Sequence, residues 1–67
     1  MFPSNDDLPW AVKKLLNDAA QSEFCTAANA AARAGGSFEE SLRAGWDAVS
    51  RIYKPNPGGR RLLWVRK

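Results

Sequence analysis

The residue types that could carry out covalent or acid–base chemistry are few in this chain. Its 67 residues include one cysteine, Cys25, and no histidine, so a thiol nucleophile would have no imidazole to activate it. Four of the seven carboxylates form the adjacent pairs Asp6-Asp7 and Glu39-Glu40, both close to expected helix starts, where acidic groups complement the positive end of the helix dipole. These residue types predict a protein that is not an enzyme.

Sites for metals and phosphates are also not predicted. Asp6, Asp7 and Asp18 lack the alternating oxygen ligands of a calcium loop, and one cysteine without histidine cannot build a zinc site. The segment Gly58-Gly59-Arg60-Arg61 lacks the P-loop pattern and is typical of a hinge followed by charge. We therefore expect no metal ion and no cofactor.

The segment best suited to bind a partner lies at the C-terminal end. Residues 1–53 carry five basic and seven acidic side chains, whereas residues 54–67 carry five basic side chains and no acidic one. Trp64 lies within this basic segment, and three interpretations stay open: it packs on the body, it belongs to a protein-binding arm, or it stacks on a nucleic-acid base while arginines contact phosphates. The candidate partner-binding residues are Arg60, Arg61, Trp64, Arg66 and Lys67.

Two helices are predicted in the first half of the chain. Leu8-Pro9 opens the first, because proline is tolerated in a first helical turn, and Asn17-Asp18 interrupts it. Asp18 with Gln21 resembles a capping box that would begin the second helix. Gly35-Gly36 should end that helix, since glycine adopts the left-handed conformation without steric cost.

A third helix is predicted from a clear start signal and a long apolar stripe. Ser37 and Glu40 have the spacing of a capping box, and Pro55 stops the helix at its far end. A short connection makes the second and third helices antiparallel neighbours. The residues expected to form the core, from the helical spacing of large apolar side chains, are Leu16, Phe24, Leu42, Trp46, Val49 and Tyr53.

The remainder of the chain is a connector and a short apolar run. Residues 62–65 could form a strand, which needs a partner, and the extended start Met1-Phe2-Pro3 is the predicted partner. The fold class is therefore mainly α: a small three-helix domain over residues 1–54, with a Pro/Gly connector and basic aromatic tail over residues 55–67 and a minimal two-stranded pairing of the termini.

The order of several short motifs resembles the ChaB family of cation transport regulators. The resemblance rests on Asp7-Leu8-Pro9, Val12-Lys13, Ala20-Gln21, Asn29 and the segment from Gly45 to Tyr53, and it covers roughly residues 6 to 54. Leu16-Asn17 replaces a Leu-Pro pair of the family, Leu42 stands where a histidine is common, and the chain is shorter between the second and third helices. The resemblance implies a divergent or shortened relative, of the kind carried by viral as well as bacterial genomes, and no catalysis.

The sequence favours a small regulatory protein that binds a larger protein partner, with a cation transporter implied by the family resemblance. The alternative is a nucleic-acid-associated protein whose basic tail contacts phosphates. No run of apolar residues is long enough to cross a bilayer, the start lacks a secretory pattern, and a lone cysteine suits a reducing compartment. We expect a cytoplasmic protein, without membrane insertion, that is a monomer or a weak homo-oligomer.

Overall fold

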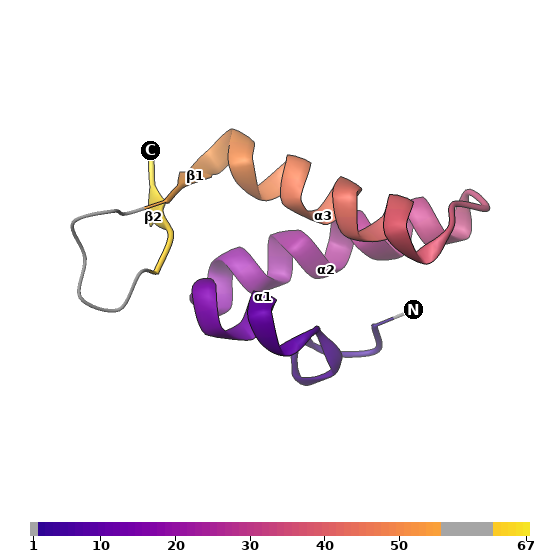
Figure 1. Cartoon of the computed structure of the whole chain (residues 1–67), viewed down its shortest axis with the longest axis horizontal. Helices are drawn as coiled ribbons and strands as arrows, with labels where there is room; N and C mark the ends of the chain where they lie inside the picture. The colour runs from indigo at the N-terminus through magenta and orange to yellow at the C-terminus, as the bar shows by residue number, and fades with distance from the viewer. Residues whose placement is uncertain (1, 56–62) are drawn as a thin grey trace.

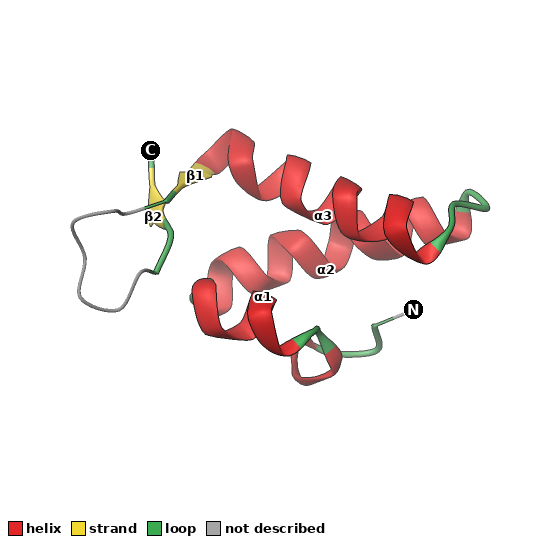
Figure 2. Cartoon of the chain, in the orientation of Figure 1, coloured by secondary structure: helices red, strands yellow, loops and turns green. Residues whose placement is uncertain are grey.

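The computed structural model describes residues 2–55 and 63–67, and it is mainly helical, as predicted (Figures 1 and 2). A 3₁₀ turn precedes three α-helices, and two short strands follow them. In chain order the elements are η1 (Asn5–Asp7), α1 (Trp10–Leu15), α2 (Asp18–Arg33), α3 (Phe38–Ile52), β1 (Tyr53–Lys54) and β2 (Val65–Arg66). In this part of the chain, none of the helices has the length and apolar character needed to cross a membrane.

The long helices α2 and α3 form an antiparallel hairpin, as predicted (Figure 1). Gly35 follows α2 with φ of 92°, the left-handed conformation that a helix end favours. The N–H of Gly36 donates to the carbonyl oxygen of Ala31 at 3.0 Å, so a second glycine lies close against the last turn of the helix. The two glycines thus turn the chain within a few residues.

The predicted start of α3 is confirmed, whereas the predicted start of α2 is wrong by one residue. The hydroxyl of Ser37 accepts from the N–H of Glu40, and the Glu40 carboxylate accepts from the N–H of Ser37. For α2, Asn17 is the N-cap, and its side chain accepts from Ala20 at 2.8 Å. Asp18 lies inside the first turn, where its charge still complements the helix dipole.

The face of α3 that packs on α2 consists of small residues. Ser41, Gly45 and Val49 follow one another at four-residue spacing and are buried. The ring of Phe24 lies directly over Gly45, because a Cβ placed on this glycine would stand 2.8 Å from three of the ring carbons. The backbone of α3 therefore approaches α2 closely at this point.

This close packing corrects part of the predicted core. Leu42 and Trp46, which the sequence placed in the core, are partly buried and pack against its edge. Phe38, the first residue of α3, is 54% exposed. The Phe24 ring already fills the space between α2 and α3 at Gly45, so the large side chains of α3 lie beside this contact. The buried hydrophobic residues are Phe2, Leu8, Val12, Leu16, Ala20, Phe24, Ala28, Val49 and Tyr53.

The N-terminal segment is held by side chains of α2. Asn29 accepts from the N–H of Phe2 at 2.8 Å and donates to the Phe2 carbonyl oxygen at 2.9 Å. The thiol of Cys25 donates to the same carbonyl at 3.3 Å. These bonds fix Phe2 in the core, where it is 6% exposed.

A two-stranded pairing is present, but its partner differs from the expected one. Tyr53 and Lys54 of β1 pair antiparallel with Arg66 and Val65 of β2. The N-terminal segment was predicted to pair with the tail. The backbone N–H and carbonyl oxygen of Phe2 form hydrogen bonds with the Asn29 side chain instead. The chain that leaves α3 straightens at Tyr53, which has extended dihedral angles, and so supplies an edge beside the returning tail.

Replacing Gly45 by alanine should destabilise the fold. The added methyl group would overlap the Phe24 ring, and overpacking of this kind costs about 1–3 kcal/mol. Thermal and denaturant unfolding of Gly45→Ala measures this loss. The double variant Phe24→Leu with Gly45→Ala should lose less than the sum of its single changes, because the smaller side chain makes room. Strict additivity would contradict the close contact.

Replacing Ser41 by alanine should leave the free energy of unfolding unchanged or raise it by up to about 1 kcal/mol. The Ser41 hydroxyl is buried and has no hydrogen-bond partner in the described part of the chain, so its removal eliminates an unsatisfied polar group. Ser50→Ala is the matched control on the exposed face of the same helix, where the hydroxyl donates to the Asp47 carbonyl. A loss above about 1 kcal/mol in Ser41→Ala would show that this hydroxyl is bonded.

Candidate functional site

A shallow groove of about 570 Å³ lies where α1, α3 and the tail meet. It is open to solvent, and its lining is mostly apolar with a charged rim. We call it the tryptophan groove, and its lining residues are Leu15, Arg43, Trp46, Asp47, Ser50 and Trp64. A second hollow of about 370 Å³ continues along α3 and shares Arg43 and Asp47 with it.

The aromatic wall of the groove is built by two tryptophans from distant parts of the sequence. The rings of Trp46 and Trp64 have centroids 5.4 Å apart and are tilted by 40°. Trp46 also packs on the core, because its ring meets the Phe24 ring edge to face with the ring centroids 5.3 Å apart. The wall thus rests on the same phenylalanine that packs over Gly45.

The tail is positioned by backbone hydrogen bonds as well as by its rings. The N–H of Trp64 donates to the Leu15 carbonyl at the end of α1 at 2.8 Å, and the N–H of Lys67 donates to Ile52 at 2.8 Å. Leu63, Trp64 and Val65 are partly buried. For residues 63–67, the interpretation that the tail packs on the body is confirmed.

The rim of the groove carries both signs of charge. Asp47 pairs with Arg51 at 2.9 Å, but both side chains are more than half exposed, so the pair contributes little to stability. Arg43 makes no ion pair among residues 2–55 and 63–67. Its guanidinium borders the aromatic surface of the groove and has no acidic partner within those two ranges.

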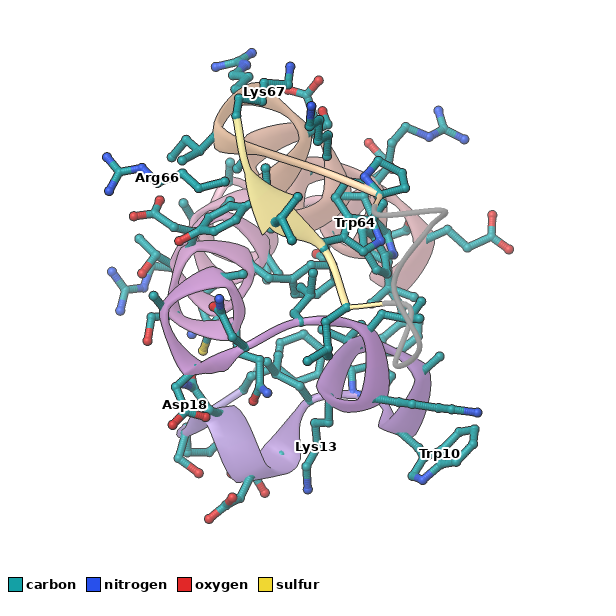
Figure 3. The ribbon with its side chains drawn as sticks, turned by 90° about the vertical axis from the view of Figure 1, so that its left-hand side faces the viewer. Trp10, Lys13, Asp18, Trp64, Arg66 and Lys67 are labelled. Atoms are coloured by element: carbon teal, nitrogen blue, oxygen red, sulfur yellow. The ribbon has the colours of Figure 1, made fainter. Side chains whose placement is uncertain are left out.

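The predicted partner-binding residues lie apart from one another where the structure describes them. Trp64 lines the groove, while Arg66 and Lys67 are exposed. Figure 3 shows Trp64 directed to the right of that view, Arg66 to the left, and Lys67 at the top. Arg60 and Arg61 lie outside the described residues. The tryptophan groove thus contains one of the predicted partner-binding residues, Trp64, together with residues that were not predicted to bind a partner.

The residues missed by the sequence share a helical face. Arg43, Trp46, Asp47 and Ser50 have the i, i+3, i+4, i+7 spacing of one side of a helix. That spacing places the four residues together, but it does not reveal that Leu15 and the tail come to meet them. Only the folded tail turns this helical face into a groove.

The Cys25 thiol is partly buried and lies among neutral groups. Its Sγ donates to the Phe2 carbonyl and accepts a long contact of 3.5 Å from the Asn29 amide. Within the described ranges, no three residues of the types His, Cys, Asp and Glu gather as a metal site would require.

The groove can bind an apolar or aromatic side chain by contact and a polar group through Arg43.

Comparison with known proteins gives no match, either to a protein-family model, to a curated protein or to a solved structure.

Replacing Trp64 by alanine should lower the free energy of unfolding by about 1–3 kcal/mol, less than a fully buried tryptophan would cost. The loss arises because the ring packs on Trp46 and the edge of the core. Thermal unfolding followed by circular dichroism measures it. Arg66→Ala is the control in the same tail, since its exposed side chain should contribute within about 0.5 kcal/mol. Equal melting temperatures for Trp64→Ala and the parent would contradict the packing.

Proposed function

We propose that this chain is a non-catalytic binding protein that recognises a segment of a larger protein in the tryptophan groove. The observation that carries the proposal is the packing of Trp64 against Trp46, which creates an aromatic recess with the Arg43 guanidinium at its rim. Aromatic and arginine side chains dominate the energetics of protein interfaces. The larger partner would place an apolar side chain on the tryptophans and an acceptor group beside Arg43.

The absence of histidine from the sequence and the surroundings of Cys25 support a role without catalysis. A nucleophilic thiol is activated by a neighbouring base or cation, whereas Cys25 faces a backbone carbonyl and an amide. The resemblance to the ChaB family stays a prediction, and it makes a cation transporter the first class of partner to test.

The alternative is binding of nucleic acid through the basic tail. Its phosphate contacts would come from Arg66 and Lys67, which are exposed, together with other basic residues of the segment. The position of Trp64 weighs against an arm of this kind, because one side of its ring packs on Trp46 and its N–H is bonded to Leu15. A nucleic-acid base would have to stack on the part of the Trp64 ring that Trp46 does not cover.

Site-specific photo-crosslinking in cells that naturally contain the chain tests the proposal. A photoreactive residue in place of Ser50, in the groove, should capture a defined protein, while the same residue at Ala30, exposed on α2, should not. Arg43→Glu should abolish the capture from position 50, because it removes the donor at the rim and adds a repulsive charge. Capture that is equal at both positions, or unchanged by Arg43→Glu, would contradict the proposal.

Titration with single-stranded DNA and RNA at two salt concentrations separates the alternative. The proposal expects weak binding without dependence on Trp64. Binding that falls steeply with salt and is lost when Arg66 and Lys67 are replaced by alanine would favour the nucleic-acid function instead.

A further inference from the structure

The N-terminal segment is bound to α2 in the way that a protein binds a separate peptide. The Asn29 side chain accepts from the N–H of Phe2 at 2.8 Å and donates to its carbonyl oxygen at 2.9 Å, so one carboxamide contacts both backbone groups of one residue. The Cys25 thiol donates to the same carbonyl oxygen at 3.3 Å. Bonds to the main chain hold extended peptides in their binding sites, while pockets for side chains select the sequence.

A pocket for an aromatic side chain accompanies these hydrogen bonds. The Phe2 ring is buried with the core, and it meets the Phe38 ring edge to face with the centroids 6.4 Å apart. Phe38 is 54% exposed, so it forms the outer wall of the place where Phe2 lies. We call the surface formed by Cys25, Asn29 and Phe38 the phenylalanine slot.

The phenylalanine slot is separate from the tryptophan groove. None of its three residues lines that groove. Figure 1 shows the N-terminal segment toward the end of the molecule that holds the turn between α2 and α3, whereas β1 and β2 lie toward the other end. The chain therefore has two distinct places where aromatic side chains are gathered.

The segment in the slot is held in a way that allows it to leave without unfolding the helices. We call residues 2–4 the strap. Pro3 and Ser4 are exposed, and the described hydrogen bonds between the strap and α2 all end on Phe2 and come from the side chains of Cys25 and Asn29. Opening the strap breaks these bonds and uncovers one ring, but it breaks no backbone hydrogen bond of a helix. Segments with so few buried contacts open locally.

Pro3 fixes the shape of the strap before it binds. A residue that precedes proline is restricted to extended conformations, and proline itself has no N–H that needs a partner. Phe2 therefore reaches the slot already extended, which lowers the entropy lost on binding. The ligand chemistry that suits the slot is an extended segment with one aromatic side chain, and a proline after the aromatic residue favours binding.

We propose that the phenylalanine slot is a peptide-binding site, that the strap is its resident occupant, and that an extended phenylalanine-containing segment of a partner protein replaces the strap there. The strap is part of the same chain, so its effective concentration at the slot is high and it acts as an intramolecular competitor. Only a segment that binds more tightly or is itself held nearby displaces it. The strap thus regulates access to a second interaction surface of the chain.

A peptide supplied in solution tests the inference on the full chain. The probe is acetyl-Phe-Pro-Ser-Asn-amide, which copies residues 2–5, and nuclear magnetic resonance of the isotope-labelled chain follows its binding. Phe2→Ala removes the competing ring, so this variant should bind the peptide roughly tenfold or more tightly than the parent, with a shift of the Asn29 side-chain amide. In the parent, millimolar peptide should displace the strap and shift the same amide.

Matched controls identify the slot as the place of binding. Adding Asn29→Ala to Phe2→Ala should abolish peptide binding, whereas adding Thr26→Ala, an exposed residue of the same helix, should leave it unchanged. The peptide with alanine in place of phenylalanine should bind neither the parent nor Phe2→Ala. Circular dichroism of each variant checks that it is folded.

Hydrogen exchange of the unaltered chain tests the opening of the strap without any variant. The Phe2 amide should exchange roughly a hundredfold faster than the Val49 amide, which is buried in α3, because the strap opens while the helices stay folded. Equal protection of the two amides, no shift of the Asn29 amide in the parent at millimolar peptide, or peptide binding that survives Asn29→Ala would overturn the inference. None of these outcomes bears on photo-crosslinking at Ser50, so this inference and the proposed function fail separately.

Discussion

The contact of the Phe24 ring with Gly45 sets how closely α3 packs on α2, and the other contacts around the groove depend on it. Because Gly45 has no side chain, α3 can approach α2 until the ring lies on its backbone. This approach buries Ser41 and Val49 on either side and forces Trp46 to the edge of the interface. Trp46 then meets the same ring edge to face and offers its other side to the tail. The contact between Gly45 and Phe24 thus determines where on α3 the Trp46 ring lies, and so where the aromatic wall of the groove can form.

The tail, residues 63–67, supplies the part of the groove that the helices do not form. Trp64 covers part of Trp46 and bonds to the end of α1, and the pairing of β2 with β1 holds the returning chain beside α3. These contacts join three segments that are distant in sequence at one place, and the groove lies at their junction. At the opposite end, Asn29 binds both backbone groups of Phe2 and so replaces the strand partner that this extended segment lacks. Hydrogen bonds thus hold both the N-terminal segment and the tail against the small core.

Local signals allowed the helices and some of their ends to be predicted, because caps act within one turn. The capping box of Ser37 and Glu40 and the left-handed Gly35 are examples. The start of α2 was predicted one residue late, and α3 ends at Ile52, before the predicted stop at Pro55. The interface of α3 was predicted less well, since a stripe of large apolar residues is a stronger sequence signal than the small residues Ser41 and Gly45. Close helix packing selects the small ones.

The candidate site was predicted only in part for a different reason. Trp64 was singled out from its place in a basic segment, but its neighbours Leu15 and Trp46 depend on contacts across the chain. Similarly, the side chain of Asn29 bonds to a residue 27 positions away, and no local pattern indicates such a contact. Pairing of the tail with Tyr53 and Lys54 also required knowledge of where α3 ends, because these residues continue its helical pattern in sequence.

The central claim is that the tail folds against α1 and α3 and thereby forms the tryptophan groove. Nuclear magnetic resonance of the dilute protein tests it most directly, through Overhauser contacts between the Trp46 and Trp64 rings and hydrogen exchange at the Trp64 amide. The structure predicts strong contacts between the two rings and a protected Trp64 amide, because that N–H is bonded to the Leu15 carbonyl. A tail whose tryptophan shows no contact with Trp46 and whose amide exchanges as fast as an unfolded peptide would contradict the account.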